Sequence, residues 1–135
     1  MLLSARILSN LTNVNSYDLG QAMTFTEGDT VTVYLQLIDL NKDTGNKPLS
    51  GRRYVPAAGA TLSVVMKSNN SAKTITKVAT APFATDLSIW SFNLLPADLA
   101  KGTLSLQLTL TQSTVATYGR ADAALLVEPA TASFV

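Results

Sequence analysis

Apolar and polar residues alternate along much of this chain, most regularly in residues 30–39. Every second position of that segment is apolar, namely Val31, Val33, Leu35 and Leu37. Because successive side chains of a β-strand point to opposite faces, the pattern predicts a strand with one buried face. The intervening positions are neutral and polar, namely Thr30, Thr32, Tyr34 and Gln36. A Gly28-Asp29 turn precedes the segment, and we expect the other strands to be arranged around it.

The same alternation recurs elsewhere and predicts about eight to ten strands in the whole chain. The clearest further segments are 60–67, 88–94 and 103–111, and the weaker ones are 2–9, 22–26, 52–56, 73–80, 115–118 and 123–127. Residues 96–101 predict one short helical turn, which Gly102 ends. Trp90 is in phase with apolar positions, so we expect it to be buried near Val33, Leu35, Leu106 and Leu108. Many short strands separated by turns are typical of an all-β antiparallel sandwich.

A chain of 135 residues is expected to form one domain. We assign residues 21–128 to the β-sandwich, residues 1–20 to an N-terminal strand or arm, and residues 129–135 to a C-terminal tail. The arm alternates too weakly to fold alone, and the tail carries apolar residues beyond the last strand, so both are expected to contact a partner protein. A basic and aromatic group in loop 40–58 could bind an anionic partner. The candidate contact residues are Leu2, Leu3, Ile7, Leu8, Arg52, Arg53, Tyr54, Phe134 and Val135.

Two alternative interpretations apply to these residues. Both termini could fray in water, as most termini do. The basic residues could be solvated charges on a sheet edge, where they block aggregation between strands, and we favour this interpretation for Arg52 and Arg53.

Charged residues make up only 14% of the chain, against about 25% in an average domain. Thr, Ser, Asn and Gln replace them, and neutral groups cost less to desolvate than charges do. We therefore interpret the polar faces of segments 30–39 and 103–111 as surfaces that other subunits cover, with a solvated Thr-rich face as the alternative. The net charge of +1 argues against a nucleic-acid partner.

The chain has no His and no Cys. It therefore lacks the usual general base, the commonest metal ligand and any thiolate chemistry. Asp39, Asn41 and Asp43 begin like a calcium loop, but Ser50 stands where that loop needs a bidentate glutamate, so we interpret them as a polar loop. We predict no enzymatic activity, no metal and no cofactor.

Two further features were weighed as sites and set aside. Glu27 and Asp29 have the spacing of a paired-carboxylate site of a glycosidase, but a turn between two strands is the favoured interpretation. Met1-Leu2-Leu3 is too short an apolar run for a signal peptide or a membrane span, so no membrane partner is predicted.

The order of these segments resembles the N-terminal domains of phage upper-baseplate and tail-fibre adaptor proteins. In that family a Gly-Asp-Thr turn opens a long alternating strand that ends near an aspartate, which here is Gly28-Asp29-Thr30 through Asp39. A Gly-Ala-Thr strand follows, here residues 59–64, and later a short turn with a glycine leads into a Leu-rich strand, here Trp90 to Leu110. The likeness covers residues 22–128, and loop 40–58 and arm 1–20 depart from it.

The resemblance implies an immunoglobulin-like sandwich that serves in assembly and has no activity. We therefore expect a structural protein of a phage virion, as a tail, baseplate or head-tail component, that is assembled in the cytoplasm of the host bacterium. Its expected partners are other virion proteins and copies of itself in a ring or lattice. The alternatives are a capsid decoration protein and a ligand-binding or carbohydrate-binding β-sandwich module.

Overall fold

The computed structural model describes residues 1–8, 23–41, 53–70 and 74–129. These residues form nine strands and no helix, which confirms the prediction of an all-β fold. The strands are β1 (Leu3–Leu8), β2 (Met23–Thr26), β3 (Val31–Asp39), β4 (Thr61–Ser68), β5 (Thr74–Ala79), β6 (Ile89–Leu94), β7 (Gly102–Gln112), β8 (Val115–Ala121) and β9 (Leu125–Glu128).

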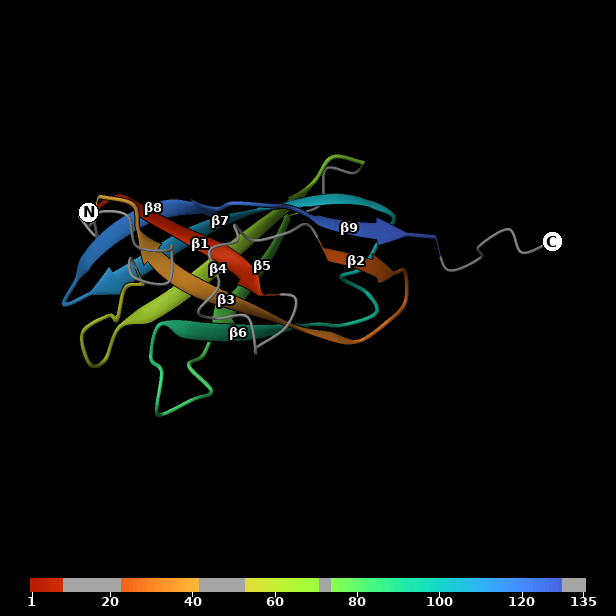
Figure 1. Cartoon of the computed structure of the whole chain (residues 1–135). Helices are drawn as coiled ribbons and strands as arrows, with labels where there is room; N and C mark the ends of the chain where they lie inside the picture. Colours follow the sequence, from red (N-terminus) through yellow and green to blue (C-terminus); the bar gives the residue numbers. More distant parts are fainter. Residues whose placement is uncertain (9–22, 42–52, 71–73, 130–135) are drawn as a thin grey trace, which may run out of the picture.

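The nine strands belong to one hydrogen-bonded sheet that folds over to enclose a sandwich-like core (Figure 1). One path through the sheet runs β2-β9-β7-β8-β1-β3-β6, and β4 and β5 continue from the other edge of β7. A bridge between Thr80 and Ser91 joins the end of β5 to β6. The sheet therefore returns on itself, and its two layers face each other across the buried side chains.

Strand β7 has the most pairing partners in this sheet. It pairs with β4 along one edge, and with β9 and then β8 along the other edge. We expected the other strands to be arranged around β3, but among the described strands β3 pairs only with β1 and β6. The two segments have the same alternation, but β7 is longer and can accommodate two strands in succession along one edge.

The core contains the apolar positions that the alternation predicted. Trp90 is 8% exposed, and Val33, Leu35, Leu106 and Leu108 belong to the same buried cluster, which confirms the expectation for this tryptophan. Its indole Nε1–H donates to the Leu87 carbonyl at 3.0 Å, so the ring is buried with its polar atom satisfied.

Three local expectations are wrong. The predicted helical turn is a β-turn, because the Asp98 carboxylate accepts the Leu95 amide at 2.8 Å and holds the chain in a turn. Segment 52–56 forms only an isolated bridge from Arg53 to Ile38 in its described part. The sheet is not wholly antiparallel, since β1 with β8 and β2 with β9 are parallel pairs. Neither parallel pair is joined by a hairpin, so no tight turn imposes an antiparallel direction.

The first strand is the largest departure from the sequence interpretation. Strand β1 lies between β3 and β8, and its Leu3, Ile7 and Leu8 are buried within this chain. These three residues are therefore part of the protein's own fold and do not form a free arm. The remainder of the predicted arm, residues 9–20, lies outside the described residues.

Candidate interaction surface

The outward side chains of β5, β4, β7 and β8 form a continuous sheet face, which we call the outer face. Inward Leu, Val, Met and Ile residues alternate with these outward residues on β4, β5 and β7. The strand registers place the outward residues in cross-strand rows. The outer face comprises Thr74, Thr76, Val78, Thr61, Ser63, Val65, Lys67, Thr103, Ser105, Gln107, Thr109, Thr111, Ala116, Tyr118 and Arg120.

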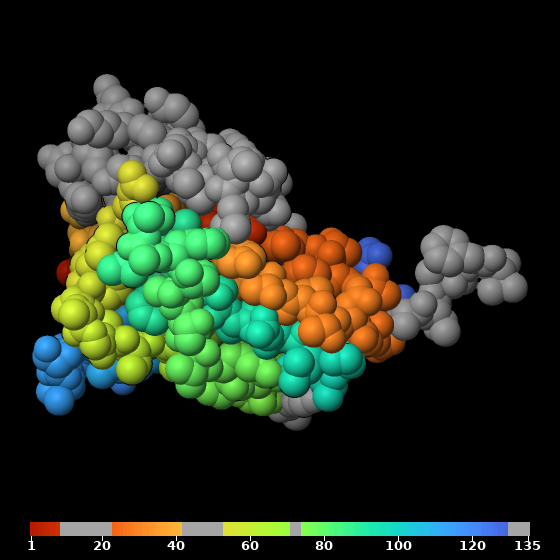
Figure 2. All heavy atoms as spheres, turned by 90° about the horizontal axis from the view of Figure 1, so that it is seen from below, coloured from red at the N-terminus to blue at the C-terminus, as the bar shows by residue number. Residues whose placement is uncertain are grey.

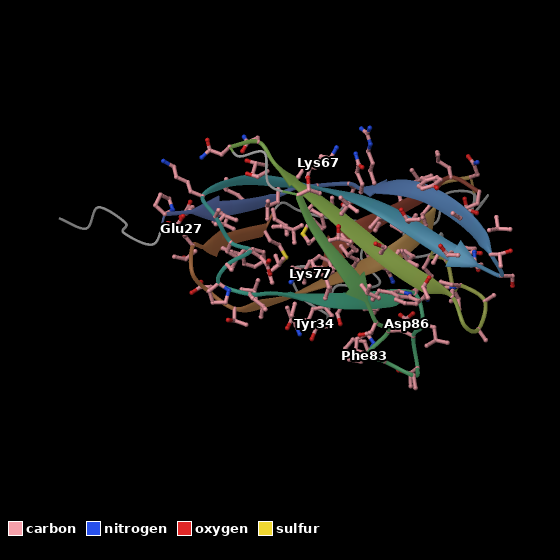
Figure 3. The ribbon with its side chains drawn as sticks, turned by 180° about the vertical axis from the view of Figure 1, so that it is seen from behind. Glu27, Tyr34, Lys67, Lys77, Phe83 and Asp86 are labelled. Carbon is pink, nitrogen blue, oxygen red and sulfur yellow. The ribbon has the colours of Figure 1, made fainter. Side chains whose placement is uncertain are left out.

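The outer face is nearly uncharged. Its ionisable cations are Lys67 and Arg120, and it contains no Asp or Glu. Lys67 projects from β4 on the side away from the core (Figure 3). Hydroxyl, amide and methyl groups make up most of the remaining surface, so covering it desolvates few charges.

Large side chains stand out on this face. Tyr118 is 75% exposed and Val78 is 71% exposed, and both lie in the cross-strand row Val78–Ser63–Thr109–Tyr118. A shallow hollow of about 320 Å³ lies beside Tyr118, and a second of about 350 Å³ adjoins it, with Gln107 and Arg120 lining both. Exposed Tyr and Arg beside hollows are the residue types that dominate protein-protein binding energy.

Some of the predicted contact residues lie elsewhere. Leu2 is 51% exposed at the end of β3 and donates its amide to the Asp39 carboxylate at 3.1 Å. Arg53 also flanks the end of β3, where it forms an ion pair with Asp86 at 3.5 Å. Tyr54 packs against the core and its hydroxyl hydrogen-bonds the Gln112 side chain, so its role here is structural. Arg52, Phe134 and Val135 lie outside the described residues.

A hollow of about 570 Å³ lies next to the Arg53–Asp86 ion pair. Its other lining residues are Val55, Ala84, Thr85 and Leu87. The charged groups of this hollow, Arg53 and Asp86, are paired with each other. Neither side chain therefore offers an unpaired charge to a ligand.

A chain of polar side chains runs from this hollow into the protein. The Ser88 hydroxyl donates to the Asp86 carboxylate, and Gln36 Nε2 donates to the Ser88 Oγ at 3.4 Å. Arg6 Nε in turn donates to Gln36 Oε1 at 2.7 Å. Ser88 is fully buried, so a substrate could not reach its hydroxyl without rearrangement. These hydrogen bonds satisfy buried polar groups.

The polar face of β3 is not a free neutral surface, which corrects the expectation for segment 30–39. Thr32 is exposed, but Gln36 and Ile38 on the same face are buried. Tyr34 stacks on Phe83 with ring centroids 6.1 Å apart, on the side of the molecule opposite Lys67 (Figure 3). The outward residues of segment 103–111, by contrast, belong to the outer face.

The carboxylates weighed as possible sites form turns in the structure. Asp39 accepts the amides of Leu2 and Asn41, which is a local turn contact, and Asp43 lies outside the described residues. Asp29 donates its amide to the Thr26 carbonyl across Gly28, and Glu27 accepts the Lys101 amide at 3.1 Å, which confirms the turn. Within the described ranges no group of three or more acidic residues could hold a metal ion.

Sequence reasoning did not single out Tyr118 or Arg120 as site residues. The signal that could have identified them is the alternation of the strand. Tyr118 and Arg120 lie at every second position from Ala116, so all three share one face of β8, and that face is exposed. The described part of the chain contains no helix long and apolar enough to cross a membrane. Neither the models of known protein families nor the curated proteins include a match to this chain.

Proposed function

We propose that this chain is a non-enzymatic structural protein of a phage virion, as a tail, baseplate or head-tail component. It acts through protein-protein contacts with copies of itself and with other virion proteins, in particles assembled in the cytoplasm of the host bacterium. The resemblance of residues 22–128 to phage baseplate and fibre-adaptor domains supports the virion assignment.

The outer face is the single observation that best supports an assembly role. Burying most of it costs little because uncharged hydroxyl, amide and methyl groups predominate and only Lys67 and Arg120 carry charge, while Tyr118 and Val78 supply apolar area. A four-stranded surface of this kind offers a broad, shallow contact, which suits a neighbouring subunit better than a small molecule.

A capsid decoration protein would use the same surface and stays an alternative within this class. A carbohydrate-binding module is supported less well, because sugar stacking needs free aromatic faces. Trp90 is buried and Tyr34 and Phe83 stack on each other, which leaves Tyr118 as the one exposed aromatic side chain among the residues with described positions.

The test is the copy number of the protein in purified virus particles, measured by quantitative mass spectrometry. The wild-type chain should be present at a fixed number of copies per particle. Thr109→Glu places a carboxylate in the middle of the outer face, where an assembled neighbour would bury it, so incorporation should fall by at least about tenfold.

Thr24→Glu is the control, because Thr24 is an exposed strand threonine that lies on β2, outside the outer face as defined. Its incorporation should equal that of the wild type. Absence of the wild-type chain from particles would refute the proposed function. Normal incorporation of the Thr109→Glu variant would show that assembly does not use the outer face.

A further inference from the structure

Strand β9 extends the outer face on the same edge of β7 that β8 occupies. It pairs with the first residues of β7, and β8 pairs with the later ones. Leu126 lies opposite the outward-pointing Thr103, so the side chains of Leu126 and Glu128 also point outward. Both are exposed, whereas Leu125 and Val127 between them are buried. An apolar and an acidic side chain therefore stand at this end of the face.

A gap in the pairing of β7 lies between β8 and β9. Ser105 and Leu106 have no partner in either strand, and the hollow of about 350 Å³ lies beside them. The connecting segment 121–124 lines it with three alanines and Asp122, and Arg120 lines it from β8. Because Ser105 and Arg120 point outward, the hollow opens on the outer face and can accept an apolar side chain such as leucine.

The charges of Arg120 and Glu128 are exposed, and neither side chain has an ion pair or hydrogen bond within the described part of the chain. Arg120 lies opposite Gln107 of β7. Glu128 follows Val127, which lies opposite Gly102. The two charges are therefore about six residues, or roughly 20 Å, apart along β7 and cannot pair within one chain. Figure 2 agrees, since the blue end of β9 lies beside the orange β2, far from the blue β7–β8 hairpin tip.

We propose that two copies of this chain pack their outer faces together about a two-fold axis that crosses β7 at Leu104. The axis lies in the plane of contact at right angles to β7, so the two β7 strands run in opposite directions. Each position before Leu104 then faces the position equally far after it in the other copy. Glu128 of each copy therefore faces Arg120 of the other, and Leu126 faces the hollow beside Ser105.

Spacing and charge favour a second copy as the occupant of this surface. Leu126 and Glu128 are two residues apart on β9, about 7 Å, and the hollow at Ser105 and the charge of Arg120 are separated by the same step along β7. The surface is thus complementary to itself, as a two-fold contact requires. A twist of about 20–25° per strand turns β2, two strands from β7, away from the partner, so the contact ends at β9.

The other cation of the face, Lys67, lies on the β4 side of β7 and faces no carboxylate in this arrangement. Sheets in contact are about 10 Å apart, which places the Cα atoms of the two Lys67 residues roughly 12 Å from each other. That distance exceeds the Debye length of about 8 Å at physiological ionic strength, so their repulsion is weak. Tyr118 and Val78 lie beyond the contact, because Thr109 in their row faces a position before the partner's β7 begins.

This pairing names a partner surface for the proposed assembly role and rests on that role for its biological meaning. Its test is sedimentation velocity of the full chain over a range of concentrations, where the wild type should form dimers. Arg120→Glu sets glutamate against glutamate at both symmetric contacts, and Glu128→Arg sets arginine against arginine. Each variant should lower the association constant at least about tenfold.

Charge exchange identifies the pair. Arg120→Glu combined with Glu128→Arg in one chain, or an equimolar mixture of the two single variants, sets opposite charges at both contacts and should recover wild-type association. The mixture should give a one-to-one heterodimer. Lys67→Glu is the matched control, because it replaces one like-charge pair by another, and its association should change no more than about twofold. Failure of both combinations to recover, or a wild-type chain that is monomeric up to about 1 mM, would overturn the pairing.

A second measurement tests the hollow without a change of charge. Leu126→Ala removes the inserted side chain from both contacts and should weaken association at least about tenfold. Val78→Ala, equally exposed but outside the contact, should leave it unchanged, and equal effects of the two would contradict the axis at Leu104. Circular dichroism shows whether each variant is folded. Loss of pairing with the chain still present in particles removes only this inference, while absence from particles with pairing intact removes only the virion role.

Discussion

Gly119 lies where the first residues of the chain cross β8. A Cβ atom at this position would come within 2.3 Å of the Leu3 carbonyl oxygen, closer than real Cβ contacts allow. The obstacle is main chain on both sides, because Leu3 is held in β1 and Gly119 in β8. A glycine is therefore required here for space, although its neighbours on β8 carry ordinary side chains.

Gly119→Ala should lower the free energy of unfolding by about 2 kcal/mol, because β1 or β8 must shift to accept the methyl group. Gly59→Ala is the comparison, since nothing lies within 4 Å of its Cβ position and only its φ of +82° opposes the change. That variant should lose about 1 kcal/mol. Urea unfolding measures both, and a Gly119→Ala variant as stable as the wild type would contradict the close crossing.

Two polar residues, Arg6 and Gln36, are buried although the alternation of the sequence predicts them to be exposed. Arg6 and Gln36 occupy positions opposite to the core-facing ones, so the alternation places them in solvent. In the structure both are buried, because the register sets them opposite each other on β1 and β3 and they hydrogen-bond at 2.7 Å. A contact between residues thirty positions apart depends on which strands pair, and the alternation does not contain that information.

At the scale of elements, the β7–β8 hairpin has an unfavourable turn. Ser113 and Thr114 both have positive φ, at 48° and 70°, as a two-residue type I′ turn requires. Asn-Gly is the pair that best adopts this conformation, whereas a β-branched threonine resists it.

Replacing Ser113 by Asn and Thr114 by Gly should therefore raise the free energy of unfolding by about 1 kcal/mol. The urea midpoint should rise with an unchanged slope, because the same surface is exposed on unfolding. A variant of equal or lower stability would show that the turn is not strained.

Strand β1 gives the sharpest test of the corrected arm. Deleting residues 1–8 should prevent folding, since β1 separates β3 from β8 and buries Leu3, Ala5 and Ile7. Circular dichroism should show loss of the sheet spectrum. Leu2→Ser is the control at an exposed neighbouring position, and its stability should change by no more than about 0.5 kcal/mol. A folded deletion variant would restore the arm interpretation.

The strand positions were predictable because a period of two is a local property of the sequence. Segments 30–39, 60–67 and 103–111 differ from β3, β4 and β7 by at most a residue or so at each end. The place of β1 was not predictable, because its alternation is weak and its burial comes from two strands far along the chain. Tyr118 and Arg120 join the outer face through pairing with β7, which is equally non-local.

At the scale of the whole molecule, charge is distributed unevenly among the described residues. The outer face carries only Lys67 and Arg120, whereas Glu27, Asp29 and Glu128 gather where β2 and β9 end. Glu27 lies at the far end of the molecule from the β7–β8 hairpin tip (Figure 3). A chain with few charges on one broad face and acidic residues at one end is suited to contact neighbours in a defined orientation.

Hydrogen–deuterium exchange of the free chain and of the same chain in purified particles tests the assembly role most directly. In the free chain the amides of Ala116 and Tyr118 have no strand partner among the described residues and should exchange fast. Assembly should slow exchange in peptides spanning 103–121 and leave peptides from β2 unchanged. Unchanged exchange across 103–121 in the particles would contradict assembly through the outer face.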